Sequence, residues 1–187
     1  MTRRLLVLLA LAASLALAAC GNAEQENETY QSENAQVAET EGIYVTVDEL
    51  KYQVQMSKQL NPALPGDRQY LTGITTELDR DEEWFAVFVL VQNYAKHAVL
   101  SAGDFEISDT RENTYVPVPI PEENTWAYRP VELQPKETLP DSNDPARERF
   151  PNGGMLLFKL KRFSLDNRPL ELTIRGLEER AIVNLDV

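Results

Sequence analysis

Apolar and polar residues alternate along most of this chain, and that period of two limits its possible folds more than any other feature. Successive side chains of a β-strand point to opposite faces, so the pattern predicts strands with one buried face. The alternating runs include "IYVTV" (43–47), "DFEI" (104–107), "LELTIR" (170–175) and "AIVNLDV" (181–187). No stretch shows a helical stripe longer than about two turns. Strands without crossover helices predict an all-β, antiparallel sandwich.

The first alternating run changes phase after Asp48-Glu49. Ile43, Val45 and Val47 share one face before that point. Beyond it, a common face is predicted for Leu50, Tyr52, Val54 and Met56. A change of phase inside a strand region indicates a bulge or a tight turn.

The segment "EWFAVFVLVQN" (83–93) is apolar on both faces. A strand of this kind is central in its sheet and covered on both sides. We expect the opposing sheet to cover one face and the long segment 57–82 to cap the other. The apolar residues expected in this cap are Leu60, Leu64, Tyr70, Leu71 and Ile74. A second core strand is predicted at 154–160, with Leu156, Phe158 and Leu160 pointing inward.

Residues 1–19 are organised like a secretory signal, with Arg3 and Arg4 ahead of an apolar run that ends in small residues. At about 1.5 Å per residue, the run 5–19 would span roughly 22 Å as a helix. The hydrocarbon core of a bilayer is about 30 Å thick. We therefore interpret 1–19 as a cleaved signal peptide and not as a permanent membrane helix.

The residues Leu17-Ala18-Ala19-Cys20-Gly21 resemble the lipobox of bacterial lipoproteins. The resemblance implies that Cys20 receives a diacylglyceryl thioether and becomes the first mature residue. Several acyl chains suffice for stable anchoring at the extracytoplasmic face of the cell membrane. Cys20 is the only cysteine, so the chain can form no internal disulfide and no cysteine metal cluster. The alternative is a secreted protein with a chance cysteine near its cleavage site.

The segment that follows, "GNAEQENETYQSENAQVAETEG" (21–42), has six glutamates and no lysine or arginine. A stretch this polar cannot bury enough apolar surface to offset the conformational entropy that it would lose on folding. We therefore predict a disordered acidic tether over 20–42. Residues 43–187 are left as one folded domain. Loss of residues 1–19, with two arginines and no acids, changes the formal net charge from −12 to −14. That charge argues against nucleic acid as a partner.

The strand region also resembles a known family. The matching segments are "YVTVDELKYQVQMSKQLNP", "FAVFVLVQNYAKHAV", "DFEISDTRENTY" and "GGMLLFKL…LELTI". They are similar to bacterial, mainly actinobacterial, lipoproteins with an immunoglobulin-like domain. The resemblance covers roughly 43–187 and implies an immunoglobulin-like β-sandwich with a non-catalytic extracellular role. It transfers no catalytic residue.

The sequence has few of the residue combinations that form catalytic or metal-binding sites. His97 is the only histidine, so any histidine relay would need it, and we expect an exposed turn residue there. The segment "DSNDPA" (141–146) begins like a calcium loop but has Pro145 and Ala146 where an EF-hand needs a ligand and a glycine. A second acidic group lies at 79–83. We assign no metal, cofactor or catalytic residue and predict that the protein is not an enzyme.

The loop "PIPEENTWAYRPVELQP" (119–135) has the composition of a ligand-binding segment. Trp126, Tyr128 and Arg129 are candidate interaction residues, because aromatic rings and arginine often anchor interfaces. The alternative is structural: Trp126 closes one end of the sandwich and Arg129 pairs with a glutamate.

Three functional hypotheses follow. The leading one is a lipid-anchored envelope protein that binds or supports an envelope protein or ligand through a non-catalytic module. The second is a small-molecule or calcium-binding lipoprotein in which segment 57–82 forms one wall of a pocket. The third is a hydrolase that uses acidic residues only.

Overall fold

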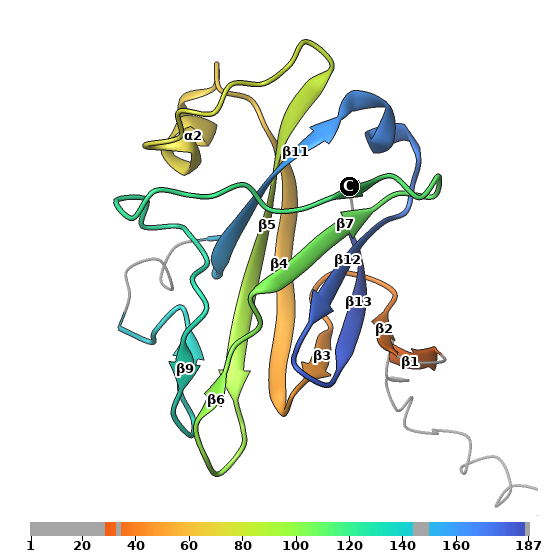
Figure 1. The fold of residues 1–187 in the computed structure, drawn as a ribbon. Helices are drawn as coiled ribbons and strands as arrows, with labels where there is room; N and C mark the ends of the chain where they lie inside the picture. The colour runs from red at the N-terminus through yellow and green to blue at the C-terminus, as the bar shows by residue number, and fades with distance from the viewer. Residues whose placement is uncertain (1–28, 33–34, 144–149, 186–187) are drawn as a thin grey trace, which may run out of the picture.

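The computed structural model describes residues 29–32, 35–143 and 150–185. Two β-sheets face each other across an apolar core (Figure 1). In sheet A, the strand order is β1-β2-β13-β12-β7-β8. These strands are β1 (Thr29–Ser32), β2 (Ala35–Ala38), β7 (Asp104–Ser108), β8 (Thr114–Tyr115), β12 (Leu170–Arg175) and β13 (Arg180–Leu185).

Sheet B is built around one long central strand. β5 (Glu82–Asn93) pairs with β4 along one edge and with both β10 and β11 along the other. The remaining strands of the sheet are β3 (Tyr44–Val47), β4 (Leu50–Leu60), β10 (Thr138–Leu139) and β11 (Gly154–Lys161). A separate two-stranded ribbon is formed by β6 (Val99–Leu100) and β9 (Glu132–Leu133).

Helical segments are short and lie outside the two sheets. In the described part of the chain they are α2 (Pro65–Arg68) and two 3₁₀ turns, η1 (Gln69–Leu71) and η2 (Arg162–Asp166). Among the described residues, no helix is both long enough and apolar enough to span a bilayer. The predicted all-β sandwich is confirmed, although two pairings among the described residues are parallel: β2 with β13, and an isolated bridge between Ala127 and Met155.

The main core lies between the sheets and contains the side chains that alternation predicts. Strands β7, β12 and β13 contribute one apolar residue in two, and the central strand β5 contributes Phe85, Val87, Val89 and Val91. The inward residues predicted for β11, Leu156, Phe158 and Leu160, are buried there. Other apolar side chains of β5 point to the opposite face of the strand and enter a second core, so both faces of β5 are buried.

The second core confirms that a cap covers the outer face of β5. Trp84, Ala86 and Phe88 point into it, and the segment that follows β4 supplies Tyr70 with the half-buried Leu71 and Ile74. The cap lies at the top of Figure 1, around α2. One expected member does not take part: Leu64 is 52% exposed, because it precedes the short helix on the outside of the cap.

A bulge in β4 corrects the face predicted for Met56. The register against β5 shifts between Val54 and Met56, so Gln55 is an extra residue in the strand. An inserted residue reverses the alternation beyond it. Val54 therefore lies in the main core, whereas Met56 packs against the second core.

The expectation of a disordered tether over 20–42 is corrected within the described residues. Strand β2 lies in this range, pairs with β13, and buries Ala35, Val37 and Ala38. Gln36 accepts a hydrogen bond from the Thr46 N–H of β3, 2.6 Å from nitrogen to oxygen. A few small apolar residues suffice here because an existing sheet edge satisfies their backbone. The predicted signal (1–19) and Cys20 lie outside the described residues.

Candidate functional site

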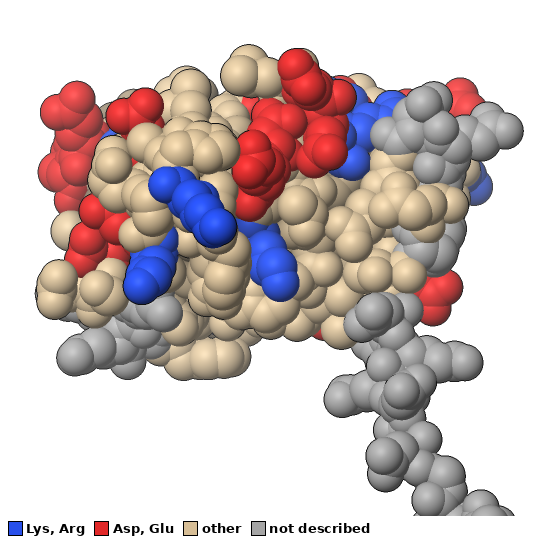
Figure 2. Space-filling model, turned by 90° about the horizontal axis from the view of Figure 1, so that it is seen from below, with Lys and Arg blue, Asp and Glu red and all other residues tan. Residues whose placement is uncertain are grey.

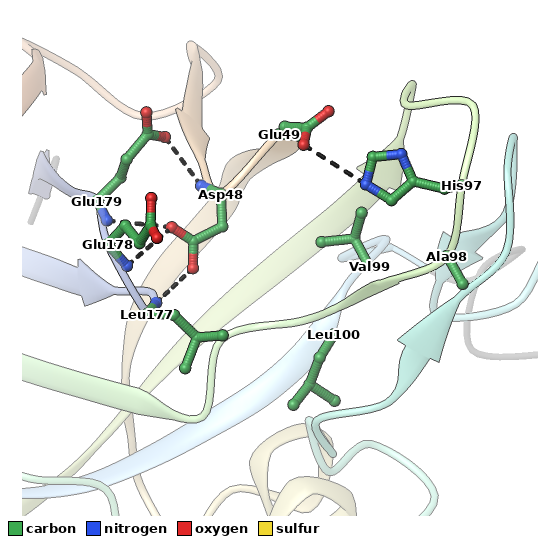
Figure 3. Close-up of a pocket in the computed structure, with 9 residues that line it drawn as sticks. All are labelled: Asp48, Glu49, His97, Ala98, Val99, Leu100, Leu177, Glu178 and Glu179. Atoms are coloured by element: carbon green, nitrogen blue, oxygen red, sulfur yellow. Dashed lines mark hydrogen bonds and ion pairs between the residues drawn. The ribbon is translucent and has the colours of Figure 1, made fainter.

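A groove opens at the end of the sandwich opposite the cap, where three segments meet (Figure 3). They are the β3–β4 turn, residues 97–100 leading into β6, and the β12–β13 turn. The groove has a volume of about 570 Å³ and is lined by Asp48, Glu49, His97, Ala98, Val99, Leu100, Leu177, Glu178 and Glu179. It combines exposed apolar and charged side chains on turns that are joined by hydrogen bonds, so we treat it as the candidate site.

The first wall is a two-residue hairpin turn. Val47 pairs with Leu50, and the two residues between them have positive φ angles, 48° at Asp48 and 68° at Glu49. Two successive left-handed residues define a type I′ turn, whose twist matches the flanking strands, and aspartate tolerates this conformation. The phase change in the sequence is thus explained by a tight turn, with the β4 bulge following it.

Asp48 joins this turn to the β12–β13 turn by reciprocal hydrogen bonds. Its carboxylate accepts from the backbone N–H groups of Leu177, Glu178 and Glu179. In return, the Glu179 carboxylate accepts from the Asp48 N–H at 2.9 Å. A Cβ at Gly176 would overlap the Asp48 carboxylate, so glycine is needed at that position. The β3–β4 and β12–β13 turns therefore hold each other in place through these hydrogen bonds.

Two leucines in the groove expose most of their surface. Leu177 is 89% exposed at the tip of the β12–β13 turn, and Leu100 is 57% exposed at the end of β6. Val99, beside Leu100, packs partly against the main core. Single exposed apolar residues are common, but two that line one groove, Leu177 on a turn and Leu100 on a strand, form a surface that a partner could cover.

The groove is acidic. Four of its lining residues carry carboxylates and none is a lysine or arginine. His97, which is 62% exposed as expected, has its Nε2 atom 3.5 Å from Oε1 of Glu49. Both side chains are open to solvent, so water screens this pair strongly.

The structure places two of the predicted interaction residues in the interior. Trp126 is 4% exposed and packs edge-on against Tyr70 and Phe88 in the second core. Tyr128 is 8% exposed in the main core, where its hydroxyl donates to the Ala102 carbonyl at 2.8 Å. Neither ring is available to a partner, which agrees with the structural alternative for Trp126.

Arg129, the third of these residues, is exposed but does not lie in the groove. Its guanidinium donates to the Pro121 carbonyl at 2.7 Å, not to a glutamate. It borders a smaller hollow of about 280 Å³ beside β11, lined mainly by apolar residues of 117–120 and 155–157.

The acidic segment 79–83 is occupied by cations of the chain itself. The Lys161 ammonium lies 3.0 Å from Asp81, and the Lys159 ammonium lies 2.9 Å from Glu82. Within the described ranges, no three histidine, cysteine, aspartate or glutamate side chains are grouped so that they could hold a metal ion. In the other acidic segment Asp141 accepts from the Asn143 N–H, and Asp144 is outside the described residues.

Among the described residues, the carboxyl groups whose pKa values shift are all shifted downward. The Asp79 N–H and the Lys159 ammonium lower the pKa of Glu82 to about 2, and Lys161 lowers the pKa of Asp81. Burial would raise the pKa of Asp67, but hydrogen bonds from Lys58 and the Asn61 N–H outweigh it. A hydrolase that uses acids needs one carboxyl with a raised pKa as proton donor. These carboxyls have the opposite shift.

Sequence reasoning missed the groove almost entirely. Asp48 was noted only as a turn residue, and Leu177 was not singled out. The sequence signal that could have identified them is the pair of acidic turns "DE" (48–49) and "GLEE" (176–179). Each follows a strand, and the two strands end on the same side of the sandwich. Their proximity depends on how the two sheets pack, which alternation does not specify.

The fold resembles known structures, whereas the sequence matches no family model and no curated protein. Three solved structures resemble the fold, each at 11% identity. The YjhA protein of Bacillus subtilis has a TM-score of 0.46, over 79% of this chain and 99% of that one. A β-sandwich protein of Clostridium difficile 630 has a TM-score of 0.44, over 84% and 99%.

The third structure is YcdA of Bacillus subtilis strain 168, described as a lipoprotein candidate. Its TM-score is 0.48, and the match covers 76% of this chain but only 38% of YcdA. With TM-scores below 0.5, we base the fold class on the strands of this chain and carry over no activity, location or partner.

Proposed function

We propose that this chain is a lipid-anchored protein of the bacterial cell envelope whose β-sandwich is a non-catalytic binding module. The lipobox-like sequence at Cys20 supports the anchor, and the exposed leucines of the end groove support the binding role. The proposal also agrees with the lipoprotein family that the sequence resembles. The observation that carries it is the 89% exposure of Leu177 on a turn fixed by Asp48.

The position of the first strand keeps the proposed anchor close to the sandwich. Strand β1 begins at Thr29, so only residues 21–28 separate it from Cys20. A fully extended chain of that length reaches roughly 30 Å. Gln31 of β1 also lines a shallow hollow together with Glu178 and Glu179 of the groove wall. These positions support the proposal that the groove lies on the side of the molecule nearer to the anchor.

The anchor is tested by replacing Cys20 with serine. Because a serine hydroxyl cannot form the thioether, we expect the Cys20→Ser protein to move from the membrane fraction to the soluble fraction. The measurement is fractionation of cells that express either protein, followed by metabolic labelling with a fatty acid. Retention of the variant in membranes, or equal labelling of both proteins, would disprove the anchor.

The binding role is tested at Leu177. A photo-reactive residue at position 100 should crosslink one defined envelope protein, and the same residue at position 64, at the other end of the molecule, should not. Leu177→Ser should reduce that crosslink at least fivefold, because it removes the most exposed apolar side chain of the groove. Leu64→Ser is the matched control, since it changes an exposed leucine on the cap. Equal crosslinking in all variants would refute the groove as the binding surface.

A further inference from the structure

We infer that the groove binds a cationic segment of a protein, one in which basic residues flank an apolar side chain. This inference rests on the proposed function and specifies the partner of the same groove. The groove combines two kinds of surface that one such segment would satisfy together: exposed leucines and carboxylates.

No lysine or arginine lines the groove itself, and Arg180, which follows Glu179, borders the adjoining hollow with Glu178 and Glu179. The carboxylates of Asp48 and Glu179 accept the hydrogen bonds that join the two turns, and their partners there are neutral backbone N–H groups. Glu49 lies 3.5 Å from His97, and Glu178 takes part in the hydrogen bonds between the turns through its backbone N–H. Lys51, next along β4, lies over the Tyr94 ring at 4.9 Å from its centroid and does not line the groove.

The net charge of the whole chain favours the same kind of partner as the carboxylates of the groove. The whole chain has a formal net charge of −12, so a cationic partner is attracted and an anionic one is repelled. The end view of the molecule shows acidic side chains in several groups, with fewer basic ones between them (Figure 2). Such complementarity raises the association rate and selects against anionic partners.

The leucines specify the apolar part of the segment. Leu177 comes from the β12–β13 turn and lies beside the Asp48 carboxylate in the close-up, whereas Leu100 comes from β6 and lies farther from the carboxylates (Figure 3). An apolar side chain placed between them would be removed from water, while basic neighbours on either side reach Glu49 and Glu178. A purely basic segment would leave the leucines exposed, and a purely apolar one would leave the carboxylates without partners.

The test uses the full-length lipidated protein in vesicles of neutral phosphatidylcholine and a short fluorescent peptide of alternating lysine and leucine. Two matched peptides carry glutamate in place of lysine or serine in place of leucine. We expect only the lysine–leucine peptide to bind measurably, with affinity falling at least fivefold between about 50 and 500 mM salt because screening weakens exposed ion pairs. The double variant Glu49→Gln/Glu178→Gln should weaken binding three- to tenfold. Glu122→Gln, an exposed glutamate elsewhere, should not change it.

The outcomes separate this inference from the proposed function. Unchanged peptide affinity in Glu49→Gln/Glu178→Gln, equal binding of the glutamate peptide, or no binding of the lysine–leucine peptide overturns the cationic partner. If Leu177→Ser still abolishes the envelope crosslink in that case, the binding role stands with a partner of other chemistry. If Leu177→Ser leaves the crosslink intact, the proposed function itself fails. Both glutamates are exposed, so unfolding curves should confirm that the variants retain the fold.

Discussion

Replacement of Asp109 by alanine is expected to lower the free energy of unfolding by about 4 kcal/mol, because removing one partner of a buried, fully bonded charge leaves the others unpaired. Asp109 is buried at the end of β7. Its carboxylate accepts from the N–H groups of Arg111 and Asn113, at 2.9 and 3.0 Å, and from the side-chain amides of Asn113 and Asn167. Alanine would leave these donors, and the Ser164 hydroxyl, without this acceptor. Urea unfolding of both proteins measures the difference.

The same carboxylate makes stability depend on pH. Burial would raise the pKa of Asp109, but hydrogen bonds from Asn167, Ser164 and Asn113 outweigh it and lower that pKa far below its ordinary value. An unfolded aspartate titrates near 3.9. The stabilisation is therefore fully present above about pH 4 and declines as the pH falls toward the folded-state pKa.

Asp109→Asn is the control that isolates the charge. The change keeps the size and one acceptor oxygen, so we expect a smaller loss, about 2 kcal/mol at pH 7. The stability gap between wild type and this variant should be constant from pH 7 to about 4 and should narrow in more acidic solution. A gap that stays constant down to pH 2 would show that the ionised carboxylate does not contribute as described.

The strand pattern was predictable because it depends on local alternation. Phe105 and Ile107 lie in the core simply because they alternate with polar residues on a one-sided strand. The central strand was found by the same reasoning, since apolar residues on both of its faces require two covers. What alternation cannot detect is one inserted residue, such as Gln55, which moves Met56 to the other face.

The site was less predictable, for two physical reasons. Composition identified Trp126 and Tyr128 as ligand-binding, but an aromatic ring in a loop can equally fill a core, and only packing decides between the two. The groove depends on contacts between residues far apart in sequence, such as Asp48 with Leu177, Glu178 and Glu179. Similarly, β2 is ordered only because the edge of β13 is free to pair with it.

The second core depends on Trp126 as its central side chain. The ring centroids of Tyr70 and Trp126 are 4.9 Å apart, and those of Phe88 and Trp126 are 6.1 Å apart, both edge to face. Beside it, the buried Asn124 amide donates to the carbonyls of Tyr70 and Thr72, at 2.9 Å each, and so ties the cap to this loop. Trp126 therefore connects β5, the cap and the loop before β11.

Trp126→Ala is accordingly expected to cost about 3–5 kcal/mol of unfolding free energy, because it removes a buried indole and leaves a cavity between three elements. Trp126→Phe should cost less, since a smaller ring retains part of the contact. Urea unfolding measures both, and limited proteolysis should show faster cleavage within 61–81 in the alanine variant. Phe163→Ala, at a half-exposed ring on η2, should change stability by less than about 0.5 kcal/mol. A loss below about 1 kcal/mol in Trp126→Ala would mean that the cap is held mainly by Asn124 and its backbone partners.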